Sequence, residues 1–479
     1  MAIKAIERTT TGIAGLDLNF GGGIPKGSMI VLAGEPGTGK TTFAAQFLYR
    51  GAVDYNERGI YVSFIEDRRT FMNNMRALGF NFEELEKEGK FRFLEMLTVK
   101  EMGVPETLNM ILKEIMGFDA KRLVLDSFTA LAQAVRETHE IRVLLHTFLN
   151  RFIKFRENTT IIITEKPYGS PGIGLGIEEF IADCVIVLKR GGLEGRTMRE
   201  LEVLKSRGLV PQESRLLFTI KDGFKCFMPF TPKEVKVKCR FKPIPEDDDK
   251  YSSGSKELDG LLGGGYPKGS LALMEIDPNV APYHKYIMAP TMWNFLAKRR
   301  GLFIVPSPGV EETSIRKLIE DGGFVMDEVK DYVRIFLKEV TEGKLKSYII
   351  PVGGKDIDAD LLKYELVGRE LRKITGRGNT LYMFGMDTLV DWYGEKAAFT
   401  MIRIAANAIR RGQHLGLMIL KPGTPELSKA VAAVAEVHLK LIREHGCLLL
   451  YGIKPRTPLH VVELDVSDGY PQPKLTPLQ

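Results

Sequence analysis

The sequence predicts an α/β fold: two tandem domains, each a mostly parallel, twisted sheet flanked by helices. Two observations lead to this prediction. Short runs of apolar and β-branched residues alternate with longer helical stretches, which is typical of parallel sheets built from β-α-β units. The first part of the chain also recurs in the second part, and the total of 479 residues is enough for two or three domains.

The repeat is clearest in two glycine-rich segments. The segment G-G-G-I-P-K-G-S at residues 21–28 recurs as G-G-G-Y-P-K-G-S at residues 263–270. The offset is 242 residues (269 − 27), and the same offset aligns residues 58–62 with residues 300–304. We therefore expect two copies of one domain, with equivalent residues 242 positions apart.

The predicted domains are residues 1–230 and 251–479, and the proline-rich, charged residues 231–250 are predicted to link them. The first helix of the first domain is expected to end near Gly51, acting as its C-cap. Strands of this domain are expected at residues 29–33, 60–64, 91–94, 122–125, 160–164 and 184–188, with a late antiparallel pair at 201–205 and 216–220.

A phosphate-binding loop is predicted between the first strand and the first helix. Residues 34–42 fit the pattern G-x-x-x-x-G-K-[ST]. Backbone N–H groups of such a loop turn inward around phosphate, and the helix N-terminus adds partial positive charge. Lys40 would reach the β- and γ-phosphates, and the Thr41 hydroxyl would bind Mg²⁺. The predicted nucleotide-binding residues are Gly34, Gly37, Thr38, Gly39, Lys40, Thr41 and Thr42.

A second predicted metal ligand is Asp126. It ends an apolar strand, and ligands of open α/β sheets bind at the carboxyl ends of the strands. The alternative is that Asp126 only caps the next helix. Because the sequence also contains the phosphate-binding loop, a metal-binding role for Asp126 is favoured over a helix-capping role.

The order of these motifs resembles the KaiC branch of the RecA-like ATPases. The matching motifs are T-G-x-x-x-L-D, G-G-G-I-P-K-G, G-E-P-G-T-G-K-T-T and G-I-Y-V-S-F-x-E-D, and the resemblance covers nearly all of residues 8–228. It implies RecA-like domains that bind ATP with Mg²⁺ between neighbouring subunits of a ring. The tandem layout resembles KaiC, a double-ringed hexamer, so a hexameric homo-oligomer is expected, here of archaeal origin.

The resemblance also implies a K-x-R motif that reaches the neighbouring subunit's nucleotide. Here that motif contains Lys205 and Arg207. Residues two apart share one face of a strand, so both cations could point at one phosphate. The alternative is a solvated strand face without a ligand.

One position departs from the family pattern. The family has a Glu-Glu pair after the second strand, and the first Glu polarises the attacking water. This chain has Ile65 at the first position and Glu66 at the second. Because an apolar side chain cannot orient water, slow ATPase activity at most is expected. Glu66 could substitute if the strand ends before it and the chain turns.

The second copy lacks the phosphate-binding loop. At an offset of 242, Gly39, Lys40 and Thr41 map to Ala281, Pro282 and Tyr283, and proline offers neither an N–H nor an ammonium group. This domain is predicted to bind no ATP in the usual way and to be a structural layer or a docking surface for an unknown protein. Asp387, Thr388, Lys454 and Arg456 echo first-domain residues as remnants or packing residues.

Composition limits the remaining possibilities. A net charge of +6 permits a nucleic-acid partner without requiring one. A glycine-rich loop at residues 166–176 could face a ring pore, but its single lysine and single tyrosine make DNA binding a less favoured alternative. No apolar run approaches a membrane span, and the N-terminus lacks a signal-peptide core, so a cytoplasmic location is expected.

Three functions remain open from the sequence. The first is an ATP-binding regulatory protein with one active and one inactive RecA-like domain. The second is a DNA-binding ATPase related to RecA and RadA. The third is a scaffold that is held together by ATP and does not hydrolyse it.

Overall fold

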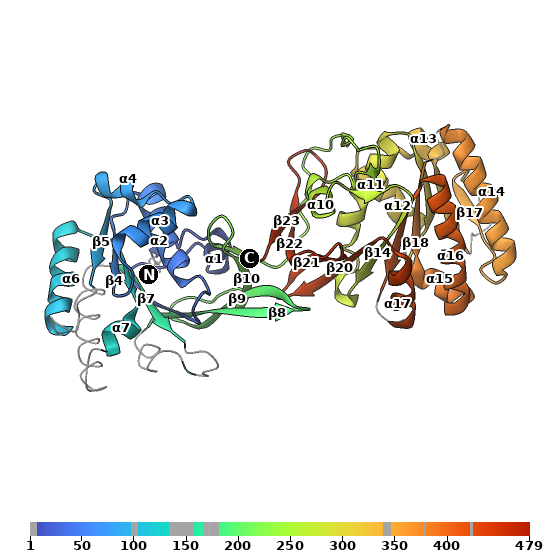
Figure 1. Ribbon diagram of the computed structural model, residues 1–479. Helices are drawn as coiled ribbons and strands as arrows, with labels where there is room; N and C mark the ends of the chain where they lie inside the picture. Colours follow the sequence, from blue (N-terminus) through green and yellow to red (C-terminus); the bar gives the residue numbers. More distant parts are fainter. Residues whose placement is uncertain are drawn as a thin grey trace, which may run out of the picture. The chain divides into compact units, whose positions relative to one another are not determined.

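The computed structural model describes residues 7–96, 104–133, 158–166, 172, 182–338, 346–376, 379–421 and 425–479 (Figure 1). The chain divides into two compact units. Unit 1 comprises Met1–Met228 and Pro477–Gln479, and unit 2 comprises Pro229–Thr476. Every helix within the described residues is too short or too polar to cross a lipid bilayer.

Unit 1 is built on one large twisted sheet, as the sequence predicts. Among the described residues its strands follow the order β11-β10-β9-β8-β3-β7-β6-β4-β5. The strands from β8 to β5 pair in parallel, and the late strands β9 to β11 add antiparallel pairs at one edge. The bounds are β3 (Met29–Gly34), β4 (Gly59–Ser63), β5 (Phe91–Glu95), β6 (Arg122–Asp126), β7 (Thr159–Glu165), β8 (Cys184–Leu193), β9 (Arg196–Ser206), β10 (Arg215–Thr219) and β11 (Lys225–Phe227).

Helices cover both faces of this sheet. Alternate residues of a strand point to opposite faces, so the apolar run of β3 feeds two separate cores. Ile30 and Leu32 pack towards α2, α3 and α4, whereas Val31 packs towards α6 and α7. The bounds are α1 (Ala14–Asn19), α2 (Lys40–Tyr55), α3 (Arg68–Ala77), α4 (Phe82–Lys87), α6 (Val104–Phe118) and α7 (Phe128–Gln133), with the short strands β1 (Arg8–Thr9) and β2 (Ile24–Pro25) before β3.

Unit 2 repeats the strand order of unit 1. Its sheet reads β17-β16-β15-β18-β19-β14-β20-β21-β22-β23 across the described residues, so β14, β15, β18 and β19 correspond to β3, β4, β6 and β7. The edge strand β17 is an addition to the pattern. The bounds are β14 (Ser270–Ile276), β15 (Gly301–Val305), β16 (Val333–Leu337), β17 (Ile349–Pro351), β18 (Thr380–Gly385), β19 (Leu415–Leu420), β20 (Val437–Glu444), β21 (Cys447–Lys454), β22 (His460–Asp465) and β23 (Gln472–Pro477).

The helices of unit 2 form two layers, seen on either side of its sheet in Figure 1. One layer contains α11 and α12, and the other contains α14 to α17. The bounds are α10 (Lys256–Leu261), α11 (Lys285–Ala297), α12 (Glu312–Asp321), α13 (Met326–Val329), α14 (Ile357–Thr375), α15 (Met386–Tyr393), α16 (Glu395–Gly412) and α17 (Pro425–Val434), with the 3-10 turns η1 (Pro278–Val280) and η2 (Lys330–Tyr332) and the small strands β12 (Lys250–Tyr251) and β13 (Tyr266–Pro267).

The segment before β12 belongs to unit 2 and packs against the rest of that unit. Phe241 is 3% exposed and its ring contacts Trp293 and Tyr470. Glu246 forms an ion pair with Arg300, with 2.8 Å between the carboxylate oxygen and the guanidinium nitrogen. This irregular stretch is therefore anchored by its side chains instead of running free through solvent.

The constant offset of 242 residues is wrong at the second strand. In the first strand, Ile30 and Ala272 both face the layer that contains the first long helix, as the offset requires. In the second strand, Tyr61 faces α2, whereas Phe303 faces the opposite layer with α14. Since side chains alternate along a strand, the two copies have slipped by an odd number of residues between these strands.

Gly51 is not the C-cap of α2, the helix after the phosphate-binding loop, contrary to the expectation. α2 continues to Tyr55 and ends at Asn56, which has a φ of 55°. Gly51 lies inside the helix, where an added Cβ would stand 2.2 Å from Nε of Arg122. Arg122 is 1% exposed, and its Nε donates to Glu57 at 2.6 Å. The glycine therefore makes room for a buried guanidinium group.

We expect Gly51→Ala to destabilise unit 1. Alanine favours a helix over glycine by about 1 kcal/mol, but displacing a buried, paired charge costs about 3–5 kcal/mol, so a net loss of about 2 kcal/mol or more is expected. Gly117→Ala in α6 is the matched control, because an added Cβ there meets nothing within 4 Å. Urea unfolding would measure both variants, and a stabilised Gly51→Ala protein would contradict the role given to Arg122.

Candidate functional site

The predicted phosphate-binding loop connects β3 to α2 at the carboxyl edge of the unit 1 sheet. Gly34 is the last residue of β3, and Lys40 is the first residue of α2. Gly37 and Gly39 have φ angles of 75° and 101°, which residues with a side chain rarely adopt. A Cβ on Gly39 would also stand 2.9 Å from Cγ2 of Ile220. The glycines are thus required for the turn that directs backbone N–H groups inward.

Thr38 and Thr42 complete the loop. Thr38 is buried, and its hydroxyl donates to the Glu35 carbonyl at 2.8 Å, which fixes the turn from within. Thr42 lies partly exposed in the first turn of α2. Together with the α2 N-terminus, the loop has the form of an anion-binding cradle.

The Lys40 ammonium group is held by the loop itself. Nζ donates to the carbonyl oxygens of Gly34 at 2.8 Å and Glu35 at 2.9 Å. Burial lowers the pKa of Lys40, while the nearby carboxylates of Glu165, Asp126 and Glu35 oppose that shift. The cation therefore lies over the loop, beside the carboxyl end of β3.

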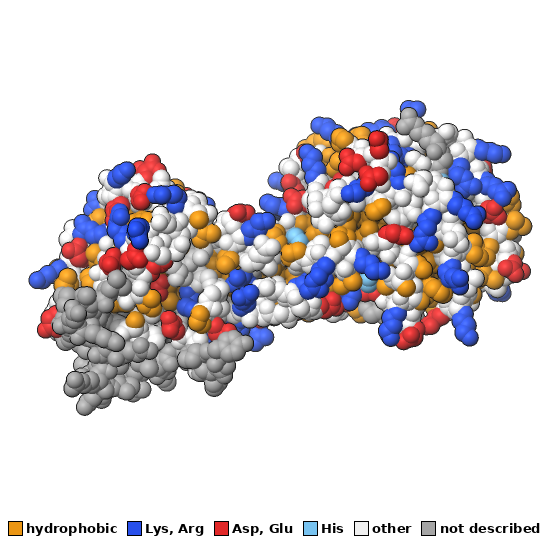
Figure 2. Space-filling view, in the orientation of Figure 1, with side chains coloured by type: hydrophobic (Ala, Val, Ile, Leu, Met, Phe, Trp, Pro, Cys, Tyr) orange, Lys and Arg blue, Asp and Glu red, His pale blue; other side chains and the backbone are white. Residues whose placement is uncertain are grey.

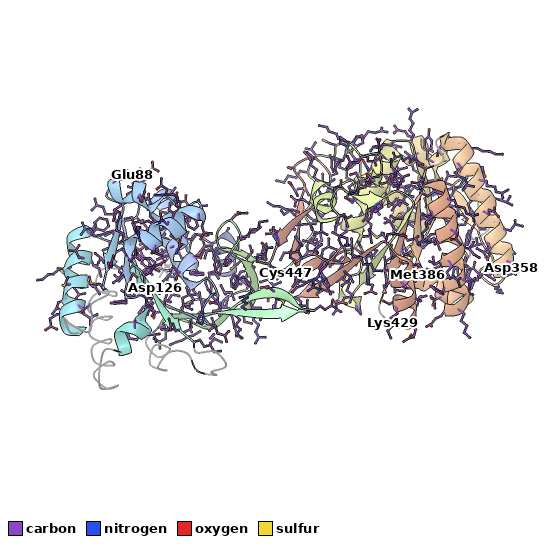
Figure 3. All side chains as sticks on the ribbon, in the orientation of Figure 1. Glu88, Asp126, Asp358, Met386, Lys429 and Cys447 are labelled. Atoms are coloured by element: carbon purple, nitrogen blue, oxygen red, sulfur yellow. The ribbon has the colours of Figure 1, made fainter. Side chains whose placement is uncertain are left out.

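Thr41, Asp126 and Tyr61 form a connected polar group beside the loop. The Thr41 hydroxyl donates to Oδ2 of Asp126 at 3.0 Å, and the Tyr61 hydroxyl donates to the same oxygen. Burial raises the pKa of the Asp126 carboxyl group, which the hydrogen bonds from Tyr61 and Thr41 and the nearby Lys40 counteract. Asp126 is labelled on the unit 1 sheet in Figure 3. A hydroxyl and a carboxylate oxygen in contact are the oxygen ligands that Mg²⁺ prefers.

Glu66 lies beyond the end of β4. The strand ends at Ser63, whose hydroxyl accepts from the Glu66 N–H at 2.9 Å and so closes a turn. The Glu66 carboxylate accepts from Nδ2 of Asn74 at 2.8 Å. Burial raises the pKa of Glu66, with further contributions from Asp126 and Asp67. Ile65 points outward and is 58% exposed.

The predicted cations Lys205 and Arg207 lie at the opposite end of the sheet from the loop. Leu201 pairs with Leu188, which in turn pairs with Gly34. A bulge in β9 pairs Lys205 with Val185, three residues before Leu188, which is about 10 Å along the sheet at ~3.3 Å per residue. Arg207 directly follows the last residue of β9 and is exposed, and its backbone N–H donates to the Asp183 carbonyl at 2.7 Å.

Arg199 is a site residue that sequence reasoning missed. It lies on β9 on the loop side of Leu201, and its guanidinium group donates to the carbonyl oxygens of Gly37 at 3.3 Å and Thr38 at 3.4 Å. Its side chain is buried, and burial lowers its pKa. A lone arginine in a strand gives no sequence signal of this contact, which depends on how the β8–β9 hairpin folds back.

Unit 2 differs from unit 1 at each of these positions. Its loop from Ile276 to α11 is longer: α2 starts six residues after Gly34 (40 − 34), and α11 starts nine after Ile276 (285 − 276). Lys285 is the first residue of α11, as Lys40 is of α2, whereas the offset aligns Lys40 with Pro282. β18 ends at Gly385, where a Cβ would stand 2.6 Å from the Ser307 nitrogen. The last residue of β18, which corresponds to Asp126 at the end of β6, therefore cannot carry a carboxylate.

The residues of unit 2 that echo the first copy make local contacts. Asp387 accepts from the Lys421 N–H at 3.3 Å, and the Thr388 hydroxyl donates to the Pro306 carbonyl at 2.6 Å. Lys454 donates to the Ala432 carbonyl at 2.8 Å, while Arg456 is exposed just after β21. The glycine-rich loop predicted to face a pore lies almost wholly outside the described residues.

Comparisons with known proteins agree with the motifs. The KaiC ATPase family model matches residues 9–227. The circadian clock oscillator protein KaiC of Thermostichus vulcanus is 33% identical over 282 residues, which cover 56% of this chain and 52% of that protein. KaiC of Synechococcus elongatus is 33% identical over 285 residues, with the same coverage. The chain thus spans about half the length of the curated relatives it matches.

A solved structure gives a further match. The KaiC-like protein of the hyperthermophilic archaeon Pyrococcus horikoshii OT3 is 36% identical, and the match covers 47% of this chain and 100% of that chain with a TM-score of 0.43. The family assignment rests on the sequence matches to residues 9–227. Residues 9–227 therefore match the KaiC family of ATPases, and the resemblance that the motifs predict is confirmed for this part of the chain.

Proposed function

We propose that this chain is an ATP-binding regulatory protein of the KaiC type. ATP and Mg²⁺ would bind in residues 1–230, and residues 251–479 would bind no ATP in the usual way and serve as a structural or partner-docking domain. The observation that carries the proposal is the loop at residues 34–42 beside the Thr41–Asp126 pair. The glycine conformations, the α2 N-terminus and the oxygen donors all fit a magnesium-bound nucleotide.

We further propose that the ATP site is completed by a neighbouring copy of the chain. Lys205 lies about 10 Å along the sheet from the level of its own loop, by the spacing of ~3.3 Å per residue, and Arg207 lies further away. Cations at that edge could meet phosphate only on another molecule, which supports a head-to-tail ring. A hexamer, a cytoplasmic location and an archaeal source stay predictions.

We propose that hydrolysis is slow at most. The family pattern has a glutamate where this chain has Ile65. The isoleucine side chain is exposed but apolar, so it offers no hydrogen bond to water. The chain turns before Glu66, which is the condition under which Glu66 could serve instead. A scaffold that holds ATP without hydrolysing it is the second candidate, and the exposed apolar Ile65 favours it.

DNA binding remains a less favoured alternative. On the face shown in Figure 2, lysine and arginine side chains are interspersed with acidic and apolar ones in both units. Nucleic-acid grooves usually concentrate several cations with stacking aromatic rings. The names of the relatives mention the circadian clock. No circadian role is proposed for this chain, because Gly385 in unit 2 takes the position that Asp126 has in unit 1.

Single-turnover hydrolysis of ATP with Mg²⁺ tests the proposal. We expect bound ATP to be converted slowly at most by the wild type and at least tenfold faster by Ile65→Glu, since a positioned base contributes about 10²–10⁴-fold. Lys40→Ala is the negative control. Conversion by the wild type that is fast and unaffected by Ile65→Glu would overturn the assignment of slow hydrolysis.

A further inference from the structure

Unit 2 contains a pocket of about 400 Å³ between α11, α12 and the sheet. It opens near the carboxyl ends of β15, β18 and β19, the edge at which α/β sheets bind ligands. Its volume falls within the range of about 300–1,000 Å³ that is usual for small-molecule sites. The deep part is apolar and is formed by Met288, Met292, Ile304, Met383 and Ile419.

Large aromatic side chains occupy the equivalent layer of unit 1. There Tyr61 of β4 packs against Phe71 of α3 with ring centroids 4.5 Å apart, and Phe93 stacks on Tyr61 at 5.7 Å. In unit 2, β15 and α12 contribute Ile304 and Ile315 to this layer. These aliphatic side chains are smaller than the tyrosine and phenylalanine that β4 and α3 contribute in unit 1.

Two buried polar groups of the pocket wall lack hydrogen-bond partners. Ser307 is 5% exposed, and its hydroxyl has no partner within the described structure. Nδ1 of His284 is likewise buried and unpartnered. A buried polar atom without a partner needs an explanation, such as a functional role or a bound water or ion. Both residues line the pocket, so a ligand there could satisfy them.

The pocket wall is positively charged. Lys285 and Lys317 line it, and no ion pair joins either lysine to a carboxylate within the described residues. The acidic member of the wall, Asp321, is paired with Lys238 at 2.9 Å. Burial, together with the nearby Lys421 and Lys285, lowers the pKa of His284 to about 4. His284 is therefore neutral near pH 7 and faces two cations.

We propose that unit 2 uses this pocket to bind a small amphiphilic anion: an apolar body with one carboxylate or phosphate group. The apolar body would fill the methionine- and isoleucine-lined depth. The anionic group would lie near Lys285 at the start of α11, whose N-terminus adds favourable partial charge. The pocket is formed by residues of unit 2, and the proposal does not depend on ATP binding in unit 1.

Calorimetric titration of the full chain with octanoate, 1-octanol and acetate tests this inference. We expect octanoate to bind once per chain, 1-octanol to bind at least tenfold more weakly, and acetate to show no binding. Lys285→Gln should weaken octanoate binding by roughly tenfold or more, the value of one charge-assisted hydrogen bond, and leave 1-octanol unaffected. Octyl phosphate in place of octanoate distinguishes the two anionic groups.

Variants that fill or spare the pocket complete the test. Ser314 lies on the exposed side of α12 and lines the pocket. Ser314→Trp should block the binding of both octanoate and 1-octanol without disturbing the core. Lys396→Gln, an exposed lysine of α16 outside the pocket wall, should bind octanoate as the wild type does. Absence of octanoate binding, equal loss with Lys396→Gln, or full binding by Ser314→Trp would overturn the proposal.

Discussion

We expect Lys40→Ala to abolish measurable ATP binding by the full chain. Lys40 supplies the ammonium group of the loop and lies at the first residue of α2. A charge-assisted hydrogen bond contributes about 1.5–3 kcal/mol, so losing two of them would lower affinity by roughly a hundredfold or more. Wild type should bind one ATP per chain, because unit 2 lacks both the loop and a carboxylate at the end of β18.

The measurement is equilibrium binding of a fluorescent ATP analogue with Mg²⁺. Because Lys40 also donates to the Gly34 and Glu35 carbonyls, the thermal midpoint of each variant is measured to separate a lost phosphate contact from a loosened loop. Lys87→Ala, an exposed lysine of α4, is the matched control and should bind as the wild type does. Residual binding of one ATP per chain by Lys40→Ala would relocate the site to unit 2.

The parts of this site that follow from local sequence could be predicted. The glycines of the loop, Lys40 and Thr41 lie within nine consecutive residues, and Asp126 ends an apolar strand. Parallel strands bring their carboxyl ends to one edge, so these residues had to meet. The hydrogen bond from Thr41 to Asp126 is the direct outcome.

Other parts depend on packing between distant segments and could not be predicted. Tyr61 looks like any core aromatic, yet its hydroxyl bonds Asp126. Arg199 touches the loop because β9 folds back beside β8. Position 51 inside α2 is a glycine because the side chain of Arg122, 71 residues later in the chain (122 − 51), occupies the space that a Cβ would need.

The residue-by-residue alignment of the two copies at a constant offset failed for a similar reason. Counting a constant offset assumes equal loop lengths, and the loop before α11 is three residues longer than that before α2. The conclusion that unit 2 lacks the loop does not depend on that offset. However, the offset paired Lys40 with Pro282 and so concealed Lys285, which begins α11 and lines the pocket.

Two variants that each bind ATP poorly should restore tight sites when they share one ring. Lys40→Ala has lost the loop cation but keeps Lys205 and Arg207, whereas the double variant Lys205→Ala/Arg207→Ala keeps the loop. If each site joins the loop of one subunit to the cations of the next, a mixed ring contains interfaces where both halves are intact. The double variant alone should bind ATP roughly tenfold or more weakly, the value of one charge-assisted contact.

Co-expression of the two variants with different affinity tags, followed by purification on both tags, yields the mixed assemblies. Tight ATP sites should return to about one quarter of the wild-type number, since each head-to-tail interface draws its two halves independently. ATP binding is the readout, so the result does not depend on whether Ile65 prevents hydrolysis. Mixed assemblies without tight sites, or a double variant that binds ATP as tightly as the wild type, would show that each chain binds ATP by itself. The cations at the far edge of the sheet would then form a solvated strand end, and the ring would need a different cause.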